Sequence, residues 1–283
     1  MRTTDFETIL SQSIQAIGMD KTFLTEESFS QIRDFADKRL KYAWEYDAFP
    51  DLIRITKFPV VNVDTLHYIL IPEDGIVTNS EGTFKVDIGT IMQVTVEDPR
   101  SKGKVREIGF SFDTYEEVVS GNVLKTVRRI FVDVSDANEL YITYKKATPD
   151  LIGDLYTTGS SYVPGQVVYW AYKANSYFSK TSGTAYGGKL GNFWKCIKAT
   201  TSEPNANNNN SPVADDAWEK VAIPAFFLHY LVKSIHADWL MSEQMMQEGF
   251  AFESQAIKLL DFEIQKLTVQ QGQQPRLKFI NPY

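Results

Sequence analysis

The chain has 283 residues, a formal net charge of −7 and an apolar content of 43%. This length and composition suit a folded protein of about two or three domains, and the acidic charge argues against a basic surface that grips nucleic-acid phosphates. The single cysteine, Cys196, excludes an internal disulfide, and neither a signal peptide nor a membrane-spanning stretch is present, so we expect a soluble protein made in a cytoplasm.

Apolar residues at helical spacing predict two helices at the start of the chain. The first covers residues 4–17 and ends at Gly18, because glycine accepts the positive φ that terminates many helices. The second begins after Thr25, whose side chain suits an N-cap, and ends near Tyr46, before a proline. The predicted apolar faces consist of Phe6, Leu10, Ile14 and Ile17 in the first helix and Phe29, Ile32, Ala36, Leu40 and Ala43 in the second.

From Leu52 the apolar period changes to two, which is typical of strands that bury one face. Clusters of Pro, Gly, Asp and Asn separate the strands. This spacing predicts a compact antiparallel β sandwich or barrel over residues 52–150. The predicted strands are 53–58, 65–71, 90–96, 107–112, 127–134 and 139–145.

A linker rich in Gly, Ser and Thr leads into a second β region, residues 156–222, which has few charges and many aromatic side chains. Pro224 then suits the first turn of a helix, and helices are predicted over residues 223–270, with a kink or break at Gly249. The tail, residues 271–283, contains Gly and Pro and is predicted to be extended. The apolar face of the C-terminal helices contains Phe227, Leu231, Ile235, Trp239, Ile257, Leu260, Ile264 and Leu267.

The order of these elements predicts an α+β protein. Helices from the two chain ends are each amphipathic, and neither end can bury its apolar face alone. We therefore expect residues 1–51 and 223–270 to pack together as one discontinuous helical domain. The β domain of residues 52–150 and the small β module of residues 156–222 would then be insertions in this helical domain.

The search for chemistry finds no catalytic set, so the sequence predicts no enzyme, no cofactor and no metal site. The stretch 183–190 nearly matches a phosphate-binding loop, but Leu190 replaces the Mg²⁺-binding Ser or Thr and a strand follows, which indicates a hairpin turn. Cys196 is interpreted as a small buried apolar residue. The three histidines lack a metal-binding pattern and are interpreted as packing or interface residues: His67, His229 and His236.

The small β module resembles the chitin-binding type of carbohydrate-binding module. The similarity rests on Tyr162-Val-Pro-Gly-Gln-Val-Val, on the aromatic strand from Phe193 that runs to a Ser-Glu-Pro loop, and on Trp218. The asparagine-rich loop before Trp218 is then a tolerated surface insertion. The resemblance implies a glycan partner, with core packing or protein contact as the alternative role of the same side chains. The candidate glycan-stacking residues are Trp170, Tyr172 and Tyr177.

Most of the chain resembles the head–tail adaptor, or neck, proteins of tailed bacteriophages. The motifs are Ala43-Trp44 followed by Phe49-Pro50, the strand Leu140-Tyr-Ile-Thr-Tyr-Lys before the small module, and the C-terminal helices. The resemblance implies a virion protein, assembled in the host cytoplasm, that forms a closed ring of roughly twelve copies between the portal and the tail or stopper protein. It also implies that the helices line the DNA channel and that the β modules lie outside.

The acidic charge is compatible with a conduit that lets double-stranded DNA pass without specific binding. Apolar faces left over on the helices suit contacts between subunits, and an extended tail could add as a strand to a neighbour. We expect no membrane partner. The candidate residues for contact with the portal or a neighbouring subunit are Arg276, Leu277, Phe279, Ile280 and Tyr283.

Overall fold

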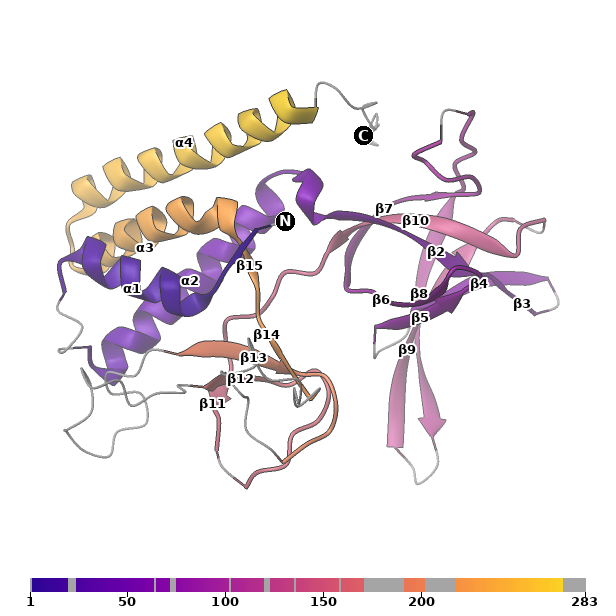
Figure 1. Cartoon of the computed structure of the whole chain (residues 1–283), viewed down its shortest axis with the longest axis horizontal. Coiled ribbons are helices and arrows are strands. Elements are labelled where there is room, and N and C mark those ends of the chain that lie inside the picture. The colour runs from indigo at the N-terminus through magenta and orange to yellow at the C-terminus, as the bar shows by residue number, and fades with distance from the viewer. Residues whose placement is uncertain are drawn as a thin grey trace. The chain divides into compact units, whose positions relative to one another are not determined.

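The computed structural model contains helices and several antiparallel sheets, which confirms the predicted α+β class (Figure 1). The chain divides into two compact units: residues 1–47 and 148–268 form the first, here called the helical unit, and residues 48–147 belong to the second, the β unit. The structure describes residues 2–19, 24–63, 65–71, 75–101, 103–119, 123–134, 136–157, 159–170, 191–201 and 217–271, except for the side chains of 84, 115–127 and 267–271.

Capping residues mark both ends of the first helix and the start of the second. Helix α1, Phe6–Ile17, starts two residues later than predicted because the Asp5 carboxylate accepts a hydrogen bond from the Thr8 N–H at 3.1 Å and caps the helix. Gly18, at φ 80°, closes it as predicted. Helix α2, Glu26–Tyr46, begins with the Ser28 N–H donating to the Thr25 hydroxyl at 3.1 Å, which confirms the predicted cap.

The C-terminal helices differ from the prediction at two points. Pro224 does not open a long helix: it pairs in the short strand β15, Ile223–Pro224, with β1, Thr3–Thr4, and a single 3₁₀ turn follows. Helix α3, Leu228–Ser242, and helix α4, Met246–Gln271, are then separated by three residues rather than by a break at Gly249. Gly249 lies within α4, which runs alongside α3 (Figure 1).

The helical unit also contains a four-stranded sheet. Phe6 of α1 packs edge to face on Phe193 and Tyr169, with ring centroids 4.9 and 6.1 Å apart. Asn192 of the same sheet accepts a hydrogen bond from the Glu7 N–H at 3.1 Å, so one face and one polar residue of the sheet meet α1. The strands, in sheet order, are β11 Asp154–Leu155, β12 Val167–Trp170, β13 Asn192–Cys196 and β14 Trp218–Lys220, with β11 and β12 parallel.

The β unit contains two larger sheets, which share one apolar core. It also contains a two-stranded hairpin. The predicted strand at 107–112 is wrong at its start, because Glu107 makes only an isolated bridge to Thr95 and the strand itself begins at Phe110. The sheets contain β2 Ile53–Pro59, β10 Glu139–Lys146 and β7 Ile88–Thr95 in one, and β3 Val61–Val63, β4 Leu66–Ile71, β9 Val123–Val132 and β8 Phe110–Val119 in the other; the hairpin joins β5 Ile76–Asn79 to β6 Gly82–Lys85.

Candidate functional site

Three helices of the helical unit meet at a buried ionic network. Arg39 of α2 donates from Nε to Asp238 of α3 at 2.7 Å and from Nη1 to Glu253 of α4 at 2.8 Å. The side chains of Arg39 and Asp238 are only 9% and 7% exposed, whereas that of Glu253 is 30% exposed. The bond to Asp238 raises the pKa of Arg39 above its usual value despite burial, so the guanidinium stays charged. It ties α2, α3 and α4 to one another.

Tyr230 lies beside this network and is buried in the helical unit. It is almost fully buried, and burial raises the pKa of its phenol to about 12. The hydroxyl therefore remains protonated at neutral pH. Its ring stacks on that of Tyr42 at 6.5 Å, which indicates a packing role.

Helix α4 rests on α2 and α3 largely through polar and aromatic contacts. The Tyr46 hydroxyl donates to Asp261 at 2.8 Å. Phe252 faces His236 at a centroid distance of 4.4 Å and the Lys233 ammonium at 4.8 Å. Among the large apolar side chains of α4 that the structure describes, only Leu260 is fully buried. We call the α2–α3 surface that these contacts define the α4 seat.

We expect His236 to make the helical unit less stable below about pH 6.5. Burial, with the nearby Lys233 cation as a second cause, lowers the pKa of His236. Because the unfolded state then binds the proton more tightly, the stability present above the unfolded pKa is lost as the pH falls through the folded pKa. Urea unfolding at about pH 7.5 and pH 5 measures how much free energy of unfolding is lost on acidification. This loss should be smaller in His236→Gln than in the wild type, with exposed His229→Gln as the control. The same loss of unfolding free energy in the wild type and in His236→Gln would contradict this expectation.

The candidate glycan residue Trp170 contributes to a cluster of aromatic side chains in the small sheet. Its ring meets Trp194 edge to face at 6.0 Å, and it packs against the core that contains Cys196, which is fully buried as predicted. Tyr162 stacks on Tyr156 in the same region at 5.4 Å. These contacts give the described aromatic side chains a packing role.

The other candidate residues lie outside the residues that the structure describes. Tyr172, Tyr177 and the loop at 183–190 all fall in residues 171–190, which the structure does not describe. The asparagine-rich loop also lies outside the described residues. The tail candidates Arg276, Leu277, Phe279, Ile280 and Tyr283 follow the last described residue.

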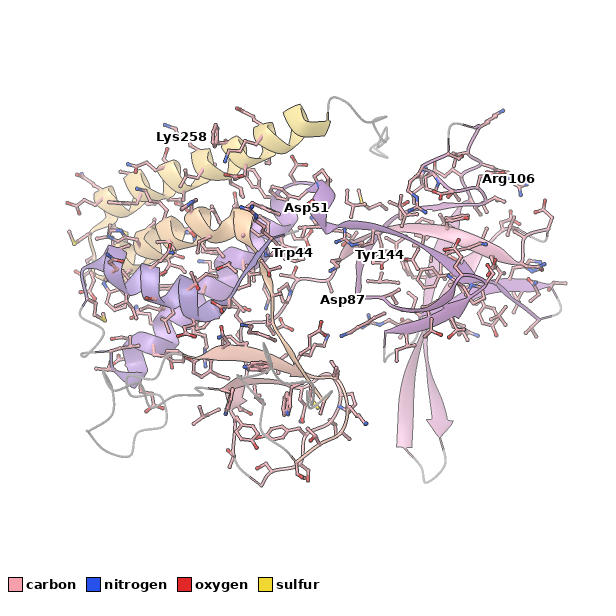
Figure 2. All side chains as sticks on the ribbon, viewed as in Figure 1. Trp44, Asp51, Asp87, Arg106, Tyr144 and Lys258 are labelled. Carbon is pink, nitrogen blue, oxygen red and sulfur yellow. The ribbon has the colours of Figure 1, made fainter. Side chains whose placement is uncertain are left out.

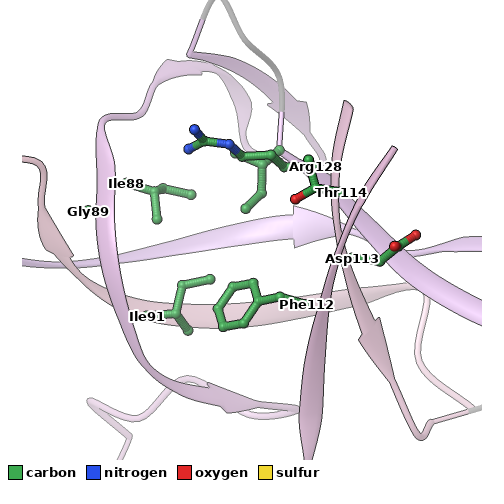
Figure 3. A pocket seen from close by; sticks show the side chains of 8 residues that line it. Ile88, Gly89, Ile91, Phe112, Asp113, Thr114 and Arg128 are labelled. Atoms are coloured by element: carbon green, nitrogen blue, oxygen red, sulfur yellow. The ribbon is translucent and has the colours of Figure 1, made fainter. Parts of the chain in front are cut away.

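The β unit has a small pocket between β7 and the sheet that contains β8 and β9. Phe112 and Ile91 lie side by side on one side of it, with Ile88 and Arg128 opposite (Figure 3). Its volume of about 120 Å³ is well below the roughly 300–1,000 Å³ of typical ligand sites. The complete lining is Ile71, Ile88, Gly89, Ile91, Phe112, Asp113, Thr114 and Arg128.

Sequence reasoning missed an apolar patch on the outer face of the second β sheet. Leu66 and Leu70 lie on the same face of β4 and are 52% and 40% exposed. Arg129 lies over the rings of Tyr68 and Phe131 and pairs with Asp113 on β8. The signal was present in the sequence, because apolar residues at both even and odd positions of β4 leave one set outside the core.

Within the described ranges, no cluster of three or more His, Cys, Asp or Glu side chains is arranged to hold a metal ion. The same part of the chain has no helix that is both long and apolar enough to cross a membrane.

Comparison of the whole sequence with protein-family models and with curated proteins finds no match.

Proposed function

We propose that this chain is a structural protein of the neck of a tailed bacteriophage, where it forms an adaptor ring between the portal and the tail. The proposal rests on the motif resemblance described above and on the contacts between helices from the two ends of the chain. In this role the molecule provides surfaces for other proteins and carries out no reaction.

The observation that carries the proposal is the buried pair between Arg39 and Asp238. It joins α2, from the first 47 residues, to α3, which begins after residue 227. Contacts of α1 and α2 with α3 support a discontinuous helical domain, and the core common to the two larger β sheets supports an inserted sandwich or barrel.

Exposed apolar side chains suit contacts between subunits in such a ring. Met245, Met246 and Phe250 cluster in sequence at the start of α4 and are 43%, 50% and 60% exposed. Grouped large apolar side chains on a surface favour protein contacts. The charge of −7 favours free passage of DNA over retention.

Mixing the protein with the portal of its own phage should produce rings visible by negative-stain microscopy and by mass photometry. Phe250→Glu should reduce ring formation, because it places a charge in the proposed contact. Lys258→Ala is the matched control, since Lys258 lies on the side of α4 that faces away from α3 (Figure 2). A protein that stays monomeric and binds no portal would overturn the proposal.

Carbohydrate binding is the weaker alternative, and the described residues do not favour it. Trp170 meets Trp194 edge to face, and Tyr162 contacts Tyr156 and Trp218, so these three aromatic contacts are with the module's own side chains.

A further inference from the structure

The turn between α3 and α4 has an unusual residue at its critical position. The Gln244 N–H donates to the Met241 carbonyl at 3.1 Å, and the Met245 N–H donates to the Leu240 carbonyl at 2.9 Å. This is the Schellman arrangement that ends many helices, and it requires one residue in the left-handed region. Gln244 occupies that position at φ 65° and is the sole non-glycine residue with positive φ in the described part of the chain.

The residues of this turn favour a continuous helix over a turn. Glycine, and sometimes asparagine, normally occupies the left-handed position, because a Cβ is strained there. Here the three connecting residues are Glu243, Gln244 and Met245, all of which are good helix formers. The local sequence therefore opposes the reversal, and the contacts between α4 and its seat must maintain it.

Those contacts are specific but not extensive. The seat binds α4 through Arg39 with Glu253 and through Tyr46 with Asp261. Gly249 allows the helices to approach closely, since a Cβ there would lie 3.1 Å from the Ala237 carbonyl oxygen and closer still to Met241. Nothing in this set of contacts depends on α4 and the seat belonging to the same copy.

We propose that α4 exchanges between two copies of this chain. When Gln244 adopts a helical φ, α3 and α4 join into one helix over residues 228–271, about 66 Å long at 1.5 Å per residue. The extended α4 can no longer reach its own seat and binds the seat of a second copy. Because every copy presents the same seat, the exchanged α4 makes the same contacts, which is why a second copy is the expected occupant.

The exposed side chains beside the turn support this exchange. Met245, Met246 and Phe250 flank the point at which the helix straightens. In an exchanged pair the two straightened segments lie close together, and these apolar side chains can form a new contact absent from the single copy. The inference holds for any association of two copies and does not require the neck function.

Substitution of Gln244, which is exposed, tests the proposal on the full chain without portal. Gln244→Gly removes the strain of the turn and should reduce the exchanged oligomer. Gln244→Ile should increase it, because a β-branched residue is poorly tolerated at positive φ but accepts a helical φ. Light scattering over a range of protein concentrations should show the oligomer-to-monomer ratio differing about ten-fold between the two variants. Indistinguishable oligomeric states would overturn the proposal.

Cross-linking between copies tests the exchange directly. A Tyr46→Cys copy is mixed with an Asp261→Cys copy and treated with a short bismaleimide; the native Cys196 is buried and contributes little background. We expect a covalent dimer from this mixture, less of it when both copies carry Gln244→Gly, and none above background from Tyr46→Cys alone. Cross-linking that occurs only within a Tyr46→Cys/Asp261→Cys double variant, and never between copies, would overturn the exchange. Ring formation with added portal is a separate measurement, so this result and that of the proposed neck function can be distinguished.

Discussion

Replacing Arg39 with methionine is expected to destabilise the helical unit by about 3–5 kcal/mol. The substitution leaves Asp238 buried at 7% exposure without its main partner, and it also removes the contact of α2 with Glu253. An uncompensated buried carboxylate is far more costly than the loss of a surface ion pair. The measurement is urea unfolding at neutral pH, monitored by the far-UV circular dichroism of the helices.

Arg33→Met is the matched control, because Arg33 pairs with Asp34, which is 58% exposed, on the same helix. Pairs of this kind contribute about 0–1 kcal/mol. Adding Asp238→Leu to Arg39→Met should recover much of the loss, since it removes the unpaired charge. If Arg39→Met costs no more than Arg33→Met, the ionic network does not hold the three helices together.

Replacing Phe6 with alanine is expected to cost about 3–5 kcal/mol, because the cavity would lie where α1, α2 and the small sheet meet. Phe6 is 1% exposed, and its ring contacts those of Phe29, Tyr169 and Phe193 at 4.9 to 6.3 Å. Far-UV circular dichroism, which follows the helices, and tryptophan fluorescence, to which the small sheet contributes three of the chain's five tryptophans, should shift together to lower urea.

Phe250→Ala is the control for this substitution, since the same side chain removed from a site that is 60% exposed should change stability by less than about 0.5 kcal/mol. Separate transitions for the helices and the small sheet would contradict the shared packing at Phe6. A loss similar to that of Phe250→Ala would do the same.

Features that depend on neighbouring residues were readable from the sequence. The cap at Thr25 and the terminator at Gly18 follow from side-chain and backbone chemistry within four residues, and both are present. The apolar face from Phe29 to Ala43 is buried as its spacing predicts. For the same reason the strand alternation in the β unit predicted most of its strands.

The α3–α4 turn shows where such reasoning fails. Glycine at 249 suggested a break, but its lack of a side chain serves close packing against Ala237 instead. The reversal occurs at Gln244, whose type predicts helix. Only contacts made by distant residues, such as Arg39 with Glu253, oppose that local preference.

The sequence by itself determined the class of the fold and most helix and strand positions, because these depend on short-range periodicity and composition. The tertiary structure alone decided which charged residues meet in the helical core, where the chain reverses between α3 and α4, and which apolar residues of β4 remain outside. Those outcomes depend on residues that are up to about 200 positions apart, as Arg39 and Asp238 are, and no local pattern records such a distance.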